Sequence, residues 1–152
     1  MPVVRAMVFE FPEDRNVWNL ETQYMFGSDI MVAPTLQPLE DSAKQNIYMP
    51  SGTWYGFWDK KKLINTGRWI EIAAAPLDRM HIWVREGAVL PWTGDRTRTF
   101  NEVGDVVRLE VYGGKSPWTV GDGQEGVLTV EQGENGKLTA KGNADIDVVY
   151  FE

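Results

Sequence analysis

The pattern of hydrophobic and polar positions is that of short strands rather than helices along almost the whole chain. Residues 3–9 (VVRAMVF) form an apolar run interrupted by a single arginine, which is typical of a strand buried on both faces. Residues 11–14 (FPED) end this run with a proline and two acidic residues. Residues 16–26 have room for one short helical turn, with Asp14 or Asn16 as its N-cap.

From residue 28 onward, short apolar or alternating segments are separated by turn residues. The sequence PSG at 50–52 has a typical turn composition. Residues 68–72 (RWIEI) alternate between apolar and polar positions, as a strand with one buried face does. The predicted strands of this first group are 30–33, 46–49, 53–58, 68–72, 81–84 and 88–91.

A second group of predicted strands begins near residue 105. Residues 92–104 (WTGDRTRTFNEVG) separate the two groups and are polar and rich in turn residues. Short strands at regular spacing predict an all-β fold. We expect a proximal β-sandwich over residues 24–92 and a smaller distal antiparallel β-domain over residues 93–152. The strands of the second group are 106–112, 118–120, 126–130, 137–141 and 145–151, with glycine-rich turns at 113–114, 121–123 and 133–136.

Composition narrows the range of partners and chemistry. The 152 residues carry a net charge of −7 and no basic stripe, which argues against nucleic acid as a partner. Cysteine is absent, so disulfides, thiolate catalysis and zinc–thiolate sites are excluded. No run approaches the roughly 18 apolar residues of a membrane helix, and the opening MPVVRAMVFEF lacks the features of a signal peptide. We therefore expect no membrane partner and a cytoplasmic location.

Three carboxylates crowd the end of the first predicted strand. Glu10, Glu13 and Asp14 lie within five residues of one another. A glycosidase needs two carboxylates held about 5–10 Å apart, and in barrel enzymes such groups stand at strand ends. The alternative is a polar exit loop without chemistry. No motif identifies a nucleophile or an acid among the three.

His81 is the single histidine of the chain. It lies in the apolar segment RMHIWV, where a half-buried structural histidine is expected. A Ser–His–Asp triad would have to use it, but no serine lies in a G-x-S-x-G elbow. An independent small enzyme using Glu10, Asp14 and His81 is the least favoured hypothesis. Residues 122–125 (DGQE) offer oxygen ligands for calcium but lack the spacing of an EF-hand, so no metal site is assigned.

Aromatic residues gather in the segment TWYGFWD. Trp54, Tyr55 and Trp58, with Phe57 between them, could form a platform that stacks on sugar rings. The alternative is that one half of the group faces the core and the other half packs against another domain. Trp54, Tyr55 and Trp58 are therefore the candidate substrate-binding residues, with packing as the competing interpretation.

Four segments, in this order, resemble one known family. They are PVVRAMVFEFPED, QYMFGSDIMVAP, IYMPSGTWYGFWD and APLDRMHIWVREGAVLP. Together they resemble the C-terminal part of glycoside hydrolase family 31, the α-glucosidases and α-xylosidases. The resemblance covers residues 2–92. Residues 93–152 match only in general character, as the family's variable distal β-domain.

The resemblance implies that residues 1–23 are a leftover strand, the last one of a catalytic (β/α)8 barrel, together with its exit segment. In the family, the stretch MFGSDIMVAP leaves the barrel and opens the proximal sandwich. The tight turn at residues 27–29 would then redirect the chain between domains, and residues 30–33 would be the first sandwich strand. Arg5 and Glu10 match family positions on the last barrel strand and would support the end of the barrel.

The same resemblance places the chemistry outside this chain. Family members are retaining enzymes that use two aspartates, and both lie on earlier barrel strands. We therefore assign no catalytic residue, metal ligand or cofactor. The expected function is that of a non-catalytic C-terminal region of an α-glycosidase, supporting the barrel and inactive alone. The alternative is a free-standing carbohydrate-binding or interaction module with the same β-sandwich.

Two protein partners are expected. The first is the catalytic barrel, whose contact with this region would also explain the seven tryptophans. The second is another copy of the chain, because residues 3–9 without their barrel neighbours would present an apolar strand edge. We expect this segment either to be disordered or to pair with a second copy in a homodimer.

Overall fold

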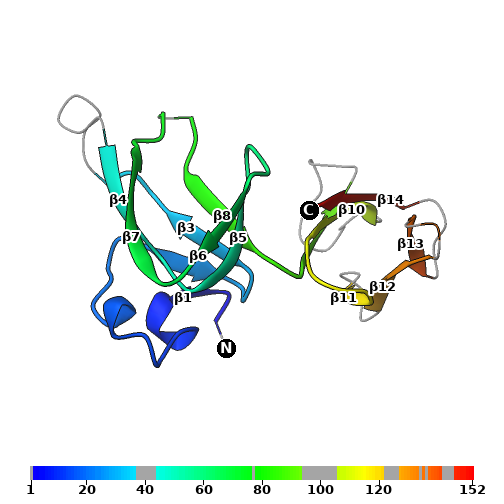
Figure 1. The fold of residues 1–152 in the computed structure, drawn as a ribbon, viewed down its shortest axis with the longest axis horizontal. Helices are drawn as coiled ribbons and strands as arrows, with labels where there is room; N and C mark the ends of the chain where they lie inside the picture. The colour runs from blue at the N-terminus through cyan, green and yellow to red at the C-terminus, as the bar shows by residue number, and fades with distance from the viewer. Residues whose placement is uncertain are drawn as a thin grey trace. The chain divides into compact units, whose positions relative to one another are not determined.

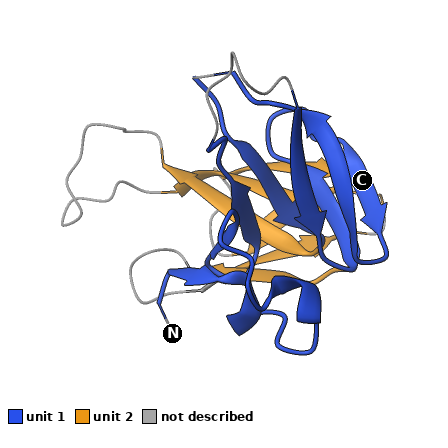
Figure 2. Cartoon of the chain, turned by 90° about the vertical axis from the view of Figure 1, so that its left-hand side faces the viewer, with its two compact units in different colours: residues 1–86 blue, residues 87–152 orange. Residues whose placement is uncertain are grey.

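The computed structural model of the chain describes residues 2–36, 44–76, 78–93, 106–121, 127–133, 135, 137–141 and 146–152. These residues form strands and two short 3-10 helices, with no α-helix among them (Figure 1). The chain divides into two compact units, residues 1–86 and residues 87–152 (Figure 2). The prediction of an all-β fold is confirmed.

Unit 1 contains a six-stranded antiparallel sheet with the order β1-β2-β3-β8-β5-β6. A second antiparallel sheet consists of β4 and β7. Figure 1 shows these two strands standing opposite the larger sheet. The strands are β1 (Val4–Ala6), β2 (Tyr24–Phe26), β3 (Ile30–Ala33), β4 (Lys44–Met49), β5 (Gly52–Gly56), β6 (Lys62–Asn65), β7 (Arg68–Ala73) and β8 (His81–Arg85).

The stretch MFGSDIMVAP forms a hairpin within the larger sheet. Phe26 of β2 pairs with Ile30 of β3, and Gly27 begins the turn with a φ of 65°. Glycine adopts this left-handed conformation without steric cost. Since β1, β2 and β3 are neighbours in one sheet, the turn joins adjacent strands of unit 1 rather than two domains, which corrects the expectation drawn from the resemblance.

The first strand is shorter and more exposed than the sequence predicts. β1 spans Val4–Ala6, and the chain then turns into the 3-10 helix η1 (Met7–Phe9). Val3 and Val4 are 59% and 54% exposed. The prediction that residues 3–9 form one strand buried on both faces is therefore wrong, because the chain folds back after β1 and buries Met7 instead. β1 also pairs with β2, so the expected disorder of this segment is not found.

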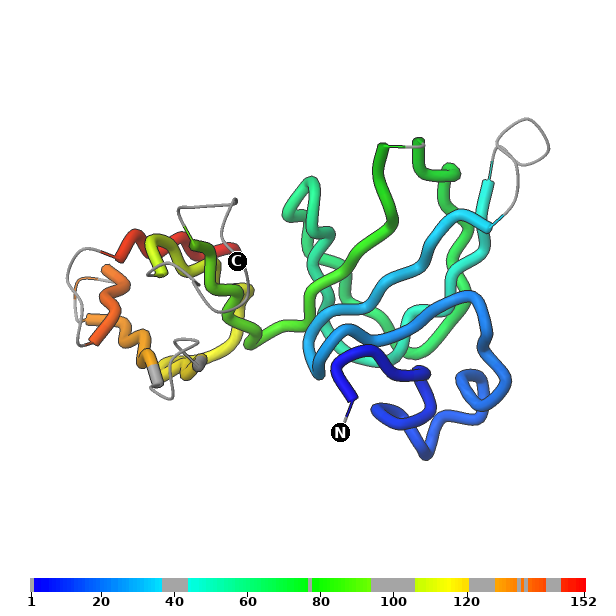
Figure 3. The backbone as a smooth tube through the Cα atoms, turned by 180° about the vertical axis from the view of Figure 1, so that it is seen from behind, coloured from blue at the N-terminus to red at the C-terminus, as the bar shows by residue number. Residues whose placement is uncertain are grey.

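The short helical turn predicted within residues 16–26 is found at the N-terminal edge of that range. It is the 3-10 helix η2 (Arg15–Val17), whose N-cap is Asp14. The Asp14 side chain accepts a hydrogen bond from the backbone N–H of Asn16 at 3.0 Å, which satisfies one of the free amides at the start of the turn. Figure 3 shows η1 and η2 together at one end of unit 1.

The core of unit 1 lies between its two sheets and beneath the N-terminal segment. Ile47 and Met49 of β4 belong to the same buried cluster as Met31 of β3 and Trp54 of β5. Val17, from η2, is part of this cluster, so the N-terminal segment is an integral part of unit 1. The buried members are Met7, Val17, Met25, Met31, Ala33, Ile47, Tyr48, Met49, Trp54 and Trp83.

Unit 2 has a separate core between two three-stranded sheets. The first has the order β14-β10-β9, and its β10–β14 pair is parallel. The distal domain is thus not wholly antiparallel as predicted, because the chain passes through three other strands before it returns to β10. The second sheet has the order β11-β12-β13. The strands are β9 (Ala88–Thr93), β10 (Val106–Tyr112), β11 (Trp118–Gly121), β12 (Val127–Gln132), β13 (Leu138–Lys141) and β14 (Asp147–Phe151).

The division between the units follows Glu86. The predicted proximal domain ends at residue 92 and so includes most of β9. In the structure, β9 pairs with β10 and belongs to unit 2. Most of the predicted boundary segment 92–104 lies outside the described residues.

Candidate functional site

Glu10 is at the centre of an ion-pair cluster that ties the N-terminal segment to β8. Its Oε2 accepts a hydrogen bond from Arg5 Nη2 at 2.5 Å, and its Oε1 accepts one from Arg85 Nη1 at 2.9 Å. The side chains of Arg5, Glu10 and Arg85 are only 9%, 17% and 30% exposed. Both carboxylate oxygens are therefore engaged in strong, charge-assisted bonds.

The pKa of Glu10 reflects this cluster. Partial burial favours the neutral carboxyl group and raises the pKa, but the hydrogen bonds and positive charges of Arg5 and Arg85 outweigh it. The net result is a pKa below the ordinary value for glutamate. A general acid in a glycosidase needs the opposite shift, so the surroundings of Glu10 suit a structural anion.

Arg85 also packs its guanidinium group against two aromatic rings. It lies 5.0 Å from the ring centre of Phe11 and 5.4 Å from that of Trp54. Such cation–π contacts add to the ion pair and hold the segment after η1 against β5. The resemblance implies that Arg5 and Glu10 support the end of a barrel, which stays a prediction. In this chain they join the N-terminal segment to β8.

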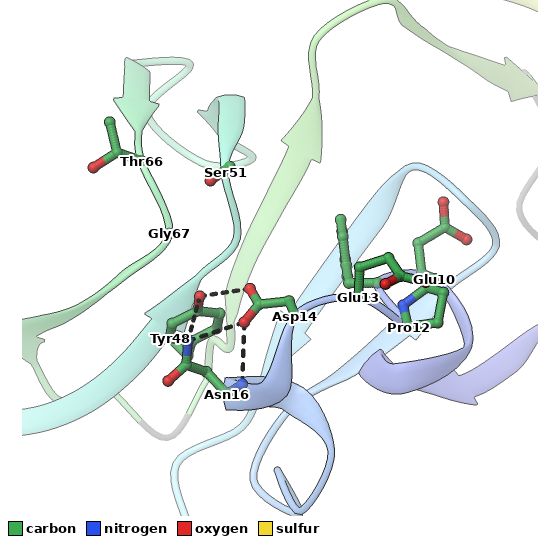
Figure 4. A pocket seen from close by; sticks show the side chains of 10 residues that line it. Glu10, Pro12, Glu13, Asp14, Asn16, Tyr48, Ser51, Thr66 and Gly67 are labelled. Atoms are coloured by element: carbon green, nitrogen blue, oxygen red, sulfur yellow. Dashed lines mark hydrogen bonds between the residues drawn. The ribbon is translucent and has the colours of Figure 1, made fainter.

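Asp14 takes part in a second network, with Tyr48 of β4 (Figure 4). Its Oδ2 accepts a hydrogen bond from the Tyr48 hydroxyl group at 2.5 Å, and its Oδ1 accepts one from Asn16 Nδ2 at 2.9 Å. Asn16 Nδ2 also donates to Tyr48 Oη at 3.2 Å. Burial raises the pKa of Asp14, but these hydrogen bonds outweigh it and lower the pKa. Burial and the bond to Asp14 raise the pKa of Tyr48.

These two networks border one cavity of about 560 Å³. Glu10, Glu13 and Asp14 all line it, and Figure 4 shows them along one side of it. Two of these three carboxylates, Glu10 and Asp14, are thus bound by structural partners. The third, Glu13, is exposed and has no such partner among the described residues. The arrangement does not present a pair of free carboxylates.

His81 lies away from these carboxylates. It is half-buried at the start of β8 and stacks on Trp83, with 5.6 Å between ring centres. Burial lowers its pKa, and a hydrogen bond to the backbone of Ala73 offsets part of this shift. His81 lines a different cavity, near Trp58. The structure therefore does not assemble the Glu10, Asp14 and His81 site of the least favoured hypothesis.

The aromatic candidates for sugar binding fall into two groups. Trp54 and Tyr55 are buried, at 1% and 0% exposure, so their ring faces are not available to a ligand. Trp54 also donates its indole N–H to the Pro50 carbonyl at 3.1 Å. Trp58 is 51% exposed. Its indole N–H donates to the Met80 carbonyl, and Arg79 lies over its ring.

Sequence reasoning missed several residues that build this region. Gln23 is buried and binds both backbone groups of Tyr48, with distances of 2.8 and 2.7 Å. Trp69, opposite Tyr48 in the β4–β7 ladder, is 51% exposed. Arg85 was visible within the motif VREG, but its partner Glu10 is 75 residues away.

The described residues offer neither a metal-binding cluster nor a membrane-spanning helix. Within the described residues, no group of three or more His, Asp or Glu side chains is placed to hold a metal ion. The weak calcium candidate at residues 122–125 lies outside the described residues. No helix in the described part of the chain is long and apolar enough to cross a membrane.

Comparisons with known proteins agree with this architecture. The model of the "Glycosyl hydrolase family 31 C-terminal domain" matches residues 1–90. The chain is 37% identical over 115 residues to an alpha-xylosidase of Saccharolobus solfataricus, covering 75% of this chain and 15% of the relative. It is 30% identical over 135 residues to probable maltase-glucoamylase 2 of Homo sapiens, covering 86% of this chain and 5% of the relative. The crystal structure of the GH31 alpha-xylosidase from Xanthomonas citri matches with a TM-score of 0.70 and 26% identity, over 99% of this chain and 18% of that one. The chain thus spans only a small part of the length of these proteins.

Proposed function

The chain belongs to glycosyl hydrolase family 31 through its C-terminal domain, and from this premise we propose that it is the non-catalytic C-terminal region of an α-glycosidase. The parent enzyme would hydrolyse α-linked glucosides or xylosides, as the names of the relatives suggest. The role of this chain is to support the catalytic barrel. Alone, it has no hydrolase activity.

The state of the carboxylates carries this proposal. Hydrolysis of a glycosidic bond needs two carboxyl groups facing the same bond. Glu10 is held by two arginines and Asp14 by Tyr48 and Asn16. Both have a pKa below the ordinary value for their residue type, so neither suits the acid role.

The outer edge of β1 is the surface we propose for the barrel. β1 stands at the end of the strand order of its sheet. Val4 and its cross-strand neighbour Phe26 are 54% and 48% exposed, and Phe9 is 63% exposed. An unpaired strand edge beside exposed apolar side chains favours a protein contact, and the barrel is the partner that the family provides.

Hydrolysis of 4-nitrophenyl α-glucoside and α-xyloside by the purified, folded chain tests the proposal. We expect no release of nitrophenol above buffer. Turnover that survives repurification would contradict it. The variants Glu10→Gln, Glu13→Gln, Asp14→Asn and His81→Asn would then identify the groups responsible.

The same edge leads us to propose that the isolated chain forms a homodimer through residues 3–9. Light scattering after size exclusion is expected to give twice the monomer mass. Val4→Lys places a charge on the edge and should restore the monomer. A monomeric wild-type chain at high concentration would contradict the dimer without affecting the proposal of a non-catalytic role.

A further inference from the structure

The cavity of about 560 Å³ in Figure 4 lies where three segments of unit 1 meet. One wall is the exit segment from Glu10 to Asn16, and the others are Ser51, after β4, and the turn between β6 and β7 with Thr66 and Gly67. This volume falls within the range of pockets that bind small molecules. The proposed function makes no use of the cavity.

Both sides of the cavity are held in place by the fold. Gly67 has a φ of 80°, and a Cβ atom there would lie 3.0 Å from Ser51 Oγ and 3.1 Å from Tyr48 Oη. Asn65 Oδ1 accepts the Gly67 N–H at 2.9 Å and fixes this turn. On the opposite side, Asp14 is fixed by its bonds to Tyr48 and Asn16. The cavity is therefore preformed, and glycine keeps it from being filled.

Several polar groups that line the cavity have unused hydrogen-bonding capacity. Among the described residues, the side chains of Glu13, Ser51 and Thr66 have no hydrogen-bond partner, and all three are exposed. They offer one carboxylate and two hydroxyl groups. None of the described residues that line the cavity is a lysine or an arginine. This set does not suit a phosphate or a carboxylate, which need positive charge, but it suits a neutral ligand with several hydroxyl groups.

Tyr48, which lines the cavity, contacts the exposed ring of Trp69. Trp69 and Tyr48 are directly opposite each other in the β4–β7 ladder and so share one face of that sheet. Their rings meet edge to face, with 5.4 Å between centres. Tyr48 is buried and points its hydroxyl group into the network of Figure 4, whereas Trp69 is 51% exposed. An exposed indole next to carboxylate and hydroxyl groups matches the two sides of a sugar ring, its C–H face and its hydroxyl edge.

We propose that this cavity is a carbohydrate-binding site, which takes one sugar unit against Glu13, Ser51 and Thr66 and supports the next unit on Trp69. The contacts are independent of the proposed function, but the choice of α-linked glucose oligomers as the ligand class rests on it. The role of the site would be to hold an oligosaccharide on the surface of unit 1. No bond is made or broken there.

The surroundings of Trp58 make it the weaker platform, although it is as exposed as Trp69. Arg79 lies 5.4 Å from its ring centre, and its indole N–H is bound to the Met80 carbonyl. The cavity next to it is lined mainly by aliphatic and aromatic side chains such as Leu63, Ile70 and Ile72. Trp58 thus provides a matched control for Trp69.

Titration of the full chain with maltotriose and isomaltotriose, followed by ¹H–¹⁵N NMR, tests the site. We expect saturable shifts at the amides of Thr66 and Gly67 and at the indole N–H of Trp69. Trp69→Ala should weaken binding about tenfold or more, and Trp58→Ala should leave it unchanged. Glu13→Gln replaces an exposed carboxylate without a partner and is expected to keep the fold and weaken binding about tenfold.

Three results would overturn the proposal. They are the absence of saturable shifts, shifts that centre on Trp58 instead, or wild-type affinity in Glu13→Gln and Trp69→Ala. If Trp69→Ala does not fold, Glu13→Gln alone decides. The sugar titration tests this binding site, whereas the release of nitrophenol tests the proposed function. Each proposal can therefore fail without the other.

Discussion

The two units of the chain are both small β-structures, but they are held together by different means. In unit 1, polar side chains join segments that are far apart in the sequence: Glu10 binds Arg85 across 75 residues, and Gln23 binds Tyr48 across 25. In the described part of unit 2, the long-range ion pair between Arg108 and Asp147 is largely exposed, at 47% and 68%. The buried Glu110 accepts a hydrogen bond from Tyr112, two residues away. The core of unit 2 is otherwise formed by apolar side chains on facing sheets.

This difference between the units coincides with the extent of the family match. The family model ends at residue 90 and so covers the unit with long-range polar links. A polar link requires specific residues at both ends, because a buried group without its partner is costly. An apolar sheet core requires only the right pattern and volume. Unit 2 can therefore differ more in sequence and keep its fold.

The largest effect is expected when the central tryptophan of either core is removed. Trp54 and Trp118 are 1% and 5% exposed, and each donates its indole N–H to a nearby backbone carbonyl. Trp54→Ala and Trp118→Ala should each cost about 3–5 kcal/mol of unfolding free energy. Amide hydrogen exchange should show reduced protection in the mutated unit and not in the other, since each unit has its own core. Equal loss in both units for either variant would contradict this separation.

A smaller effect is expected from breaking the ion-pair cluster. Glu10→Gln leaves Arg5 and Arg85 without their shared anion and should destabilise unit 1 by about 1–3 kcal/mol in urea unfolding. Glu13→Gln, three residues away on the surface, should change stability by less than about 0.5 kcal/mol. If the two variants unfold alike, the cluster does not contribute as described.

These contrasts also show what the sequence could reveal. The alternation of residues 68–72 predicts a strand from local pattern alone, and the structure has β7 there. The turn composition at 50–52 is equally local, and β4 ends at Met49 and β5 begins at Gly52. The capping role of Asp14 is similarly local. In contrast, the apolar pattern of residues 3–9 predicts one continuous strand, because nothing in that pattern indicates that Glu10 turns back to bind Arg5.

The candidate site was harder to predict for the same reason. Glu10, Glu13 and Asp14 were identified as a group, but their roles depend on Arg85 and Tyr48, which are distant in sequence. Trp54 and Trp58 look alike in the sequence, yet one is in the core and the other at the surface. Trp69 lies in an ordinary alternating strand, and only its contact with Tyr48, which lines the cavity, distinguishes it.

Acidification should weaken unit 1 through the same carboxylates. Glu10 and Asp14 have a lower pKa in the folded chain than the ordinary values of 4.5 and 3.8. Their contribution to stability is thus fully present above those ordinary values and is lost as the pH falls through the folded-state values. The midpoint temperature of thermal unfolding should fall between about pH 6 and about pH 3. Glu10→Gln should make this dependence of the midpoint on pH less steep. An unchanged slope in the variant would contradict the assignment to Glu10.

The smallest effect is expected from an ion pair of similar length in unit 2. Lys141 Nζ lies 2.9 Å from Glu131 Oε1, the same distance that separates Arg85 Nη1 from Glu10. These two side chains are 70% and 47% exposed, so water screens their attraction. Lys141→Ala should change the unfolding free energy by less than about 0.5 kcal/mol. A cost as large as that of Glu10→Gln would mean that distance rather than burial decides the strength of these pairs.

The most direct test of the central claim is the pKa of Glu10, measured from the ¹³C shift of its carboxyl carbon in an NMR titration. The claim is that this carboxylate holds the fold and performs no acid chemistry. We expect a pKa below 4.5, moving up when Arg85→Gln removes one of its two partners. A pKa above the ordinary value for glutamate would contradict the claim and return Glu10 to the candidates for a general acid.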